Sequence, residues 1–122
     1  MTVLTTKNLS LAPSPIPLYL YADQYDKGNG NSGRYFILNI QLNGNNYYPQ
    51  TGATVNVEGT KPNGETFNHI ITNTLSMVYL PVLEDMTDIA GNVEMQIVVK
   101  EGNNRTASQL IILDVQRSAY NP

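Results

Sequence analysis

Residues 54–71 read TVNVEGTKPNGETFNHII, and this stretch decides the fold class. The run TVNVEGT alternates valine with polar residues, which is the pattern of a strand with one buried face. Pro62 fixes φ at the first central position of a turn, and Asn63 and Gly64 tolerate left-handed geometry. KPNG therefore predicts a hairpin turn, and the run ETFNHII is expected to return as the next strand.

Alternation of the same kind fills the rest of the chain. Apolar residues take the even positions from 16 to 22 and from 36 to 42, and the odd positions from 93 to 99, so we expect these positions to face inward. Shorter strands are expected at 75–80 and in the final run SQLIILDV. The runs NGNN, TNT and KEGNNR supply turns between the strands.

One segment, PVLEDMTDIAG, has a different period. Leu83, Met86 and Ile89 recur every three residues, which predicts one or two helical turns that cross between the sheets and end at Gly91. No other run is amphipathic over a helical length. About seven closely spaced strands with one short helical turn predict an all-β fold, an antiparallel β-sandwich.

Composition excludes several classes of function. The chain has 122 residues, about one domain, and a net charge of -3 without clusters of Lys and Arg. Phosphate binding needs concentrated positive charge, so nucleic acid is not an expected partner, and an anionic membrane surface is disfavoured. No signal peptide or bilayer-spanning run is present, which favours a soluble chain made in a cytoplasm. The absence of Cys excludes disulfides and thiolate chemistry.

Two glycine-rich stretches imitate ligand-binding motifs. GNGNSG, at 28–33, has the spelling of a dinucleotide loop, but it opens a strand where that mechanism needs a helix. The stretch around Lys61 lacks the spacing of a phosphate-binding loop. The polar residues from Asp23 to Asn31 lack the spacing of a calcium-binding EF-hand, so we interpret them as a solvated loop, with ion binding left open.

Catalytic residues are sparse. His69 is the only histidine, and it has no G-x-S-x-G nucleophile elbow or set of metal ligands to work with. Its position in ETFNHII favours a partly buried, hydrogen-bonded structural histidine. A weak third hypothesis is a small hydrolase that uses Glu84, Asp85 or Asp88. We expect no catalytic residue, no metal site and no cofactor.

The eight tyrosines favour binding over catalysis. Tyr19, Tyr21, Tyr35, Tyr47 and Tyr48 fall on or beside the outward positions of their strands. Tyr suits interfaces because its ring supplies contact area at a low entropic cost and its hydroxyl tolerates water. The same rings suit sugar stacking, but without any Trp a protein contact is the preferred hypothesis.

Two further segments are predicted to contact partners. If the odd positions of the last strand face the core, Leu110 and Ile112 face the other side, where either the chain covers them or a partner docks. The arm from Leu9 to Pro17 lacks the alternation of a packed strand, so it is expected to lie on a neighbour. The predicted interface residues are Leu9, Leu11, Pro13, Pro15, Tyr19, Tyr21, Tyr47, Tyr48, Leu110 and Ile112.

The order of three runs resembles a known family: YYPQTGATVNVEGTKPNGETF, LSMVYLPVLEDMTDIAGNVEMQIVV and TASQLIILDV. The matching features are TGATV leading into a strand, the KPNG hairpin, the M-x-x-x-x-G-x-V step and the apolar strand that ends at Asp114 and Val115. From Arg34 to Val115 the chain resembles the N-terminal domain of the baseplate upper protein of phages infecting Gram-positive bacteria. Among these, phages of lactococci with a double-disc baseplate are the most similar.

The resemblance implies an Ig-like β-sandwich that docks the receptor-binding apparatus to the central tail hub, in the virion and without catalysis. It implies other baseplate proteins as partners, with the receptor-binding protein held by a C-terminal part that follows this chain, and a homotrimer of the full-length protein. We then expect an arm, first strand and Gly/Asn loop at 1–33, the sandwich at 34–117 and the start of a linker at 118–122. The alternative is a carbohydrate-binding module for a cell-wall glycan.

Overall fold

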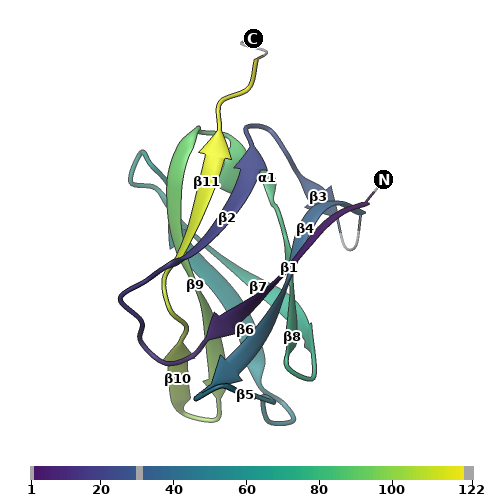
Figure 1. Ribbon diagram of the computed structural model, residues 1–122, viewed down its shortest axis with the longest axis vertical. Coiled ribbons are helices and arrows are strands. Elements are labelled where there is room, and N and C mark those ends of the chain that lie inside the picture. The colour runs from purple at the N-terminus through teal and green to yellow at the C-terminus, as the bar shows by residue number, and fades with distance from the viewer. Residues whose placement is uncertain (1, 30–31, 120–122) are drawn as a thin grey trace.

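The computed structural model describes residues 2–29 and 32–119 and confirms an all-β fold, whose strands form two layers (Figure 1). Within these residues no helix has the length and apolarity that a membrane span requires. In chain order the elements are β1 (Thr2–Ser10), β2 (Leu18–Asp23), β3 (Gly28–Asn29), β4 (Ser32–Leu42), β5 (Asn45–Asn46), β6 (Thr54–Thr60), β7 (Thr66–Thr74), β8 (Met77–Pro81), α1 (Glu84–Thr87), β9 (Gly91–Glu101), β10 (Asn104–Ala107) and β11 (Ile111–Gln116).

The strands follow one path, β1-β4-β8-β7-β6-β9-β11-β2. Strand β7 joins the two layers, because it pairs with β6 up to Ile71 and with β8 from Thr72 onward. The short strands β3 and β5 pair with β4, and β10 pairs with β9. Strands β1 and β2 lie at the two ends of the path and do not pair with each other, so the sheet does not close completely. The two strands diverge towards one end of the molecule (Figure 1).

Two pairings are parallel, which corrects the expectation of a purely antiparallel sandwich. Strand β1 runs parallel to β4, and β2 runs parallel to β11. Turn chemistry predicts only hairpins between neighbours in sequence, whereas parallel neighbours need a long connection. Residues 11–17 carry the chain from β1, at one end of the strand order, to β2, at the other end. The two strands therefore do not form a hairpin with each other, and each pairs with a strand that comes later in the sequence.

Residues 2–10 form the packed strand β1, which corrects the expectation of an arm from Leu9 to Pro17 at its first residues; residues 13–16 are exposed in the connection to β2. Leu9 and Leu11 are buried in the chain's own core. The backbone N–H of Ser10 donates to Oε1 of Gln109 at 2.8 Å, and the N–H of Gln109 donates to the Ser10 carbonyl at 2.8 Å. Leu9 and Leu11 therefore stabilise the fold and are not available to a partner.

The core lies between the two layers and consists largely of the residues that the alternation predicted to face inward. Burying these side chains supplies the main driving force for folding. Ile16 and Leu42 are exceptions, because they lie beyond or at the end of their strands and are exposed. The predicted inward residues that are buried are Leu20, Ala22, Phe36, Leu38, Ile40, Val55, Val57, Val93, Met95, Ile97, Val99, Ile111, Leu113 and Val115.

Two of the predicted turns have the expected geometry. In KPNG the N–H of Gly64 donates to the Lys61 carbonyl at 2.9 Å, and Gly64 has a φ of 90°. In NGNN, Asn43 and Gly44 have φ values of 54° and 83° and join β4 to β5 through a two-residue loop. Positive φ at both central residues is typical of the tight hairpin turn that matches the twist of the strands.

The prediction of a turn at TNT is wrong, because β7 continues through Thr74 and the chain reverses at Leu75 and Ser76 instead. Leu75 has a φ of 55°, a conformation that Leu rarely adopts. Ser76 is buried, and its hydroxyl donates to Oδ1 of Asn39 on β4 at 2.6 Å. This contact with a distant strand places the turn where local turn preferences do not predict it.

The predicted helical turn is confirmed as α1, but it ends at Thr87 with Asp88 as its C-cap, whereas Gly91, the predicted end, already begins β9. Met86 is buried in the core, and Leu83 packs against it. The Thr87 hydroxyl donates to the Asp26 carbonyl at 2.5 Å, and the Tyr25 N–H donates to the Thr87 carbonyl at 3.0 Å. The helix thus fixes the loop that follows β2.

Candidate interaction surface

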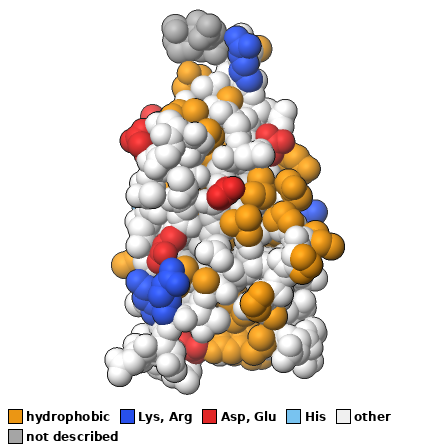
Figure 2. All heavy atoms as spheres, turned by 90° about the vertical axis from the view of Figure 1, so that its left-hand side faces the viewer, with side chains coloured by type: hydrophobic (Ala, Val, Ile, Leu, Met, Phe, Trp, Pro, Cys, Tyr) orange, Lys and Arg blue, Asp and Glu red, His pale blue; other side chains and the backbone are white. Residues whose placement is uncertain are grey.

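Four of the predicted interface residues lie together on the outer face of β2 and β11. Tyr19 pairs in register with Ile112, and Tyr21 pairs with Asp114, so their side chains leave the same face of the sheet. Leu110 directly precedes β11 and has the same parity as Ile112. We call Tyr19, Tyr21, Leu110 and Ile112 the β2–β11 patch. Figure 2 shows hydrophobic side chains gathered along the right-hand side of the molecule as viewed there.

Exposure differs within the β2–β11 patch. Tyr19, Tyr21 and Leu110 are 49%, 58% and 36% exposed, whereas Ile112 is only 7% exposed. Ile112 lies on the central strand of three, between Tyr19 on β2 and Glu94 on β9. The alternative left open by the sequence is thereby resolved for Ile112, which its own chain covers, while the two tyrosines and Leu110 remain accessible.

Tyr47 does not belong to an exposed surface, contrary to the prediction. Its ring packs against the core, and its hydroxyl donates to a carboxylate oxygen of Glu101, which is itself buried. The other carboxylate oxygen of Glu101 accepts the N–H of Gln50 at 2.9 Å. The hydrogen bond to Glu101, together with burial, raises the pKa of Tyr47 above 10.0. Tyr47 therefore fixes the segment between β5 and β6.

The remaining predicted residues are scattered. Tyr48 is 57% exposed but follows β5, in another part of the fold. Pro13 and Pro15 are exposed in the connection between β1 and β2. Tyr35, which the sequence placed among the outward tyrosines, is buried. Only the β2–β11 patch therefore brings predicted residues together.

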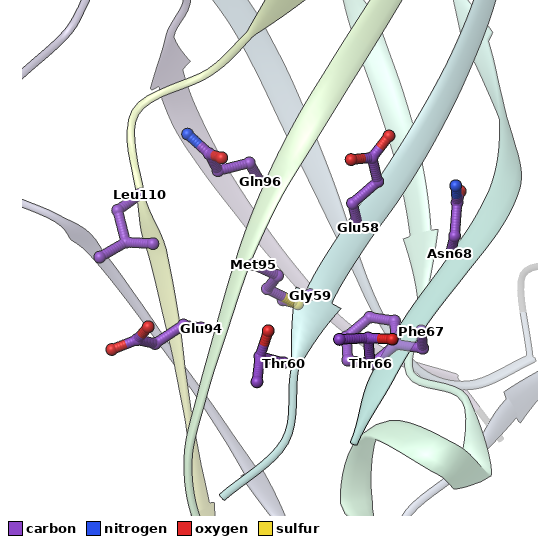
Figure 3. A pocket seen from close by; sticks show the side chains of 10 residues that line it. All are labelled: Glu58, Gly59, Thr60, Thr66, Phe67, Asn68, Glu94, Met95, Gln96 and Leu110. Carbon is purple, nitrogen blue, oxygen red and sulfur yellow. The ribbon is translucent and has the colours of Figure 1, made fainter. Parts of the chain in front are cut away.

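A polar groove of about 530 Å³ lies beside the patch, on the outer face of β7, β6 and β9 (Figure 3). Its side chains are partly tied to neighbours: Arg105 donates to Glu58 at 2.8 Å, and Gln96 donates to the Ser108 carbonyl at 2.8 Å. Asn56 donates to Asn68 at 2.8 Å. The lining residues are Glu58, Gly59, Thr60, Thr66, Phe67, Asn68, Glu94, Met95, Gln96 and Leu110.

A second, more apolar groove of about 520 Å³ lies where β7 separates from β8. It is lined by His69, Ile70, Ile71, Thr72, Tyr79, Pro81 and Leu83. Ile70 is 76% exposed, and sequence reasoning missed it. The signal was present in HII, where two adjacent isoleucines place apolar side chains on both faces of one strand.

His69 matches the prediction of a partly buried, hydrogen-bonded histidine. Its Nε2 lies 2.7 Å from Oδ2 of Asp85, and its ring stacks on Phe67 with a centroid distance of 5.8 Å. Of the three carboxylates in the hydrolase hypothesis, Asp85 is thus engaged with His69. Asp88 is engaged with Lys61, whose Nζ lies 3.0 Å and 3.1 Å from its two carboxylate oxygens.

The loop considered for an ion is held by an internal ion pair. Nε of Arg34 donates to Oδ2 of Asp26 at 2.5 Å, and the same oxygen accepts the N–H of Asp23 at 2.9 Å. Asn31 lies outside the described residues. Across the described part of the chain, no group of three or more His, Cys, Asp or Glu side chains is placed to hold a metal ion.

No protein-family model matches the chain, and no curated protein matches it in sequence. Among solved structures, its fold is similar to the N-terminal domain of phage TP901-1 ORF48, with a TM-score of 0.61 and 11% sequence identity. The similarity covers 92% of this chain and 99% of that domain. Over this length, the two chains share a fold.

Proposed function

We propose that this chain is a structural adaptor of a phage tail baseplate, which docks the receptor-binding apparatus to the central tail hub through protein–protein contacts. The observation that carries the proposal is the similarity in fold to a phage domain, which extends over nearly the whole of both chains. The order of sequence motifs from Arg34 to Val115, which resembles that of the baseplate upper protein, supports the same function. In this proposal the domain acts in the virion, has no catalytic role, and belongs to a longer protein that forms trimers.

The surface chemistry supports a role in assembly. An adaptor needs two contact surfaces, and the fold presents two accessible apolar areas that β6 and β9 separate in the sheet order. One is the β2–β11 patch, with Leu110 accessible, and the other is the groove between β7 and β8, with Ile70 accessible. Burying such side chains against a partner removes apolar area from water.

Co-expression of this chain with the tail hub protein of the phage that encodes it tests the proposal. The expected result is a complex whose mass, measured after affinity purification, gives the stoichiometry. Ile70→Ser is expected to weaken the complex without lowering the melting temperature, because Ile70 is 76% exposed. Leu110→Ser, at a 36% exposed site, is expected to weaken the complex more than it destabilises the fold. Tyr48→Ser serves as a control at an exposed site outside both areas. Absence of a complex with the hub protein counts against an adaptor that docks through this chain.

The polar groove favours a second candidate function, the binding of a cell-wall glycan. Hydroxyl, amide and carboxylate groups of Thr60, Asn68 and Glu94 line it, and such groups bind sugars by hydrogen bonds. Of the proposed stacking platforms, Tyr47 is already engaged with Glu101. Titration of the chain with purified cell-wall polysaccharide, followed by calorimetry, decides this case. Binding that Asn68→Ala abolishes would support the glycan-binding function.

A further inference from the structure

The hydrogen bonds of β2 show which of its backbone groups face β11, the one strand that pairs with it among the described residues. The N–H of Leu18 donates to the Leu110 carbonyl at 2.9 Å, and the N–H of Gln24 donates to the Gln116 carbonyl at 2.7 Å. In a parallel ladder, residues on one strand alternate between facing one neighbour and facing the other. The even-numbered residues of β2 therefore bond to β11.

The odd-numbered residues of β2 direct their N–H and C=O groups towards the open edge. Asp23, the last of them, has its N–H bonded to Oδ2 of Asp26 at 2.9 Å. Tyr19 and Tyr21 remain, and in the described part of the chain β2 has no strand on this side. Tyr19 and Tyr21, which are separated by Leu20, thus combine free backbone groups with exposed aromatic side chains.

This edge lacks the usual protection against strand pairing. Natural edge strands carry Lys, Pro or bulges that keep other strands away. The sequence of β2 is LYLYAD, whose only charge is at its end, where Asp23 lies 3.7 Å from Arg34. The opposite edge strand, β1, carries Lys7 and several polar residues. The contrast points to β2 as an edge that accepts a strand.

We propose that β2 pairs with β2 of a second copy of this chain, antiparallel, about a two-fold axis at Leu20. In this register Tyr19 of each copy lies opposite Tyr21 of the other copy. Both are then hydrogen-bonded pairs, each exchanging two N–H···O bonds, while Leu20 meets Leu20 in a non-hydrogen-bonded pair. All the free edge groups of the two tyrosines find partners, and the bonds between β2 and β11 are unchanged.

Self-complementarity selects a second copy over an unrelated strand. A two-fold interface requires a surface that complements itself, and LYLY supplies one when it is turned end for end. The Tyr rings of the two copies lie side by side on one face, where cross-strand aromatic pairs are stabilising. Each Asp23 lies three residues from the axis, so the two carboxylates are about 20 Å apart at about 3.4 Å per residue.

The interface is small, so dimerisation is expected to be weak and dependent on concentration. Hydrogen exchange of the isolated chain, measured by NMR at two concentrations, with the higher about 1 mM, is the direct test. The amides of Tyr19 and Tyr21 should exchange rapidly when dilute and become protected when concentrated. The amides of Leu20 and Ala22, bonded to β11, should be protected in both samples. Unchanged exchange at Tyr19 and Tyr21 would overturn the proposal.

Sedimentation velocity of variants gives an independent readout. Tyr21→Lys places a charge on the edge and should abolish the dimer, while Tyr48→Lys replaces a Tyr of nearly equal exposure elsewhere and should retain it. Tyr21→Pro should also abolish it, because it removes an edge N–H that β11 does not use. Circular dichroism verifies folding of each variant. A chain that stays monomeric to about 1 mM, or a dimer that survives Tyr21→Lys, refutes pairing through β2.

Cross-linking tests the register, and the chain offers a background without Cys. Tyr19→Cys and Tyr21→Cys are prepared separately and oxidised alone and as an equal mixture. The two positions oppose each other at a Cα separation of about 5.5 Å, within the range of a disulfide. Only the mixture should give a disulfide-linked dimer, and efficient linkage of Tyr19→Cys alone would exclude this register. Because no tail protein is present, the outcome is independent of the adaptor function.

Discussion

Gly59→Ala is expected to destabilise the fold, although strand propensity predicts the opposite. Glycine in a strand interior costs about 0.5–1 kcal/mol relative to alanine, so the substitution should stabilise an isolated strand. In the structure, a Cβ at Gly59 would lie 2.5 Å from Cζ of Phe67, 2.8 Å from the Glu94 carbonyl oxygen and 2.9 Å from Cβ of Met95. The steric and conformational effects therefore have opposite signs.

The steric cost is expected to exceed the conformational gain. Carbon atoms in contact prefer separations of about 3.5–4.0 Å, and the atoms of Glu94 and Met95 belong to β9, which pairs directly with β6. They can move away only by disturbing that pairing. Overpacking of this kind costs about 1–3 kcal/mol. After the conformational gain is subtracted, a net loss of about 1 kcal/mol remains at the midpoints of the two ranges and about 2.5 kcal/mol at most. A loss of about 1 kcal/mol lowers the melting temperature by roughly 3–5 °C.

Urea denaturation followed by circular dichroism measures the difference. Thr60→Ala, at the adjacent exposed position, is the matched control and should change the stability by less than about 0.5 kcal/mol. Phe67→Leu in the Gly59→Ala background removes only one of the three close contacts, so it should not restore the original stability. If Gly59→Ala is as stable as the unmodified chain or more stable, the close approach of β6, β7 and β9 at this position is wrong.

Three further predictions concern interactions inside the fold. Leu9→Ala should cost about 2–5 kcal/mol in urea denaturation because it leaves a cavity in the core, whereas Ile16→Ala, at a 72% exposed site, should be nearly neutral; equal effects would return Leu9 to a surface role. Tyr47→Phe should cost about 1–3 kcal/mol because it leaves buried Glu101 with one donor fewer. The raised pKa of Tyr47 means that its contribution is complete below pH 10.0 and is lost as the pH rises through the higher folded-state pKa, so a stability curve of Tyr47→Phe as steep as that of the unmodified chain would contradict this. The hydrogen bond to Asp88 likewise raises the pKa of Lys61 above 10.5, so the free energy of unfolding should fall as the pH rises through this higher pKa. Lys61→Met should remove this part of the pH dependence, measured by urea denaturation at a series of pH values. A slope at alkaline pH that Lys61→Met leaves unchanged would show that the ion pair is not involved.

The sequence predicts which types of residue form the candidate surface, but it does not predict which of those residues are exposed. Alternation places Tyr19 and Tyr21 on an outward face, and the structure leaves both exposed. Ile112 and Tyr47 have equally suggestive patterns, yet one is covered by neighbouring strands and the other is bound to Glu101. Whether an outward side chain meets water depends on strands that are distant in sequence, and alternation does not report on those strands.

The sequence alone determined the all-β class, the hairpins at KPNG and NGNN, and the helical turn around Met86. Each depends on a few adjacent residues, because turn conformations and strand alternation are local properties. Only the tertiary structure decided that β1 and β2 pair in parallel with β4 and β11, that Leu9 belongs to the core, and that β2 is left with an open edge. These features join segments as far apart as residues 18 and 111, whose pairing is selected by burial of a shared core.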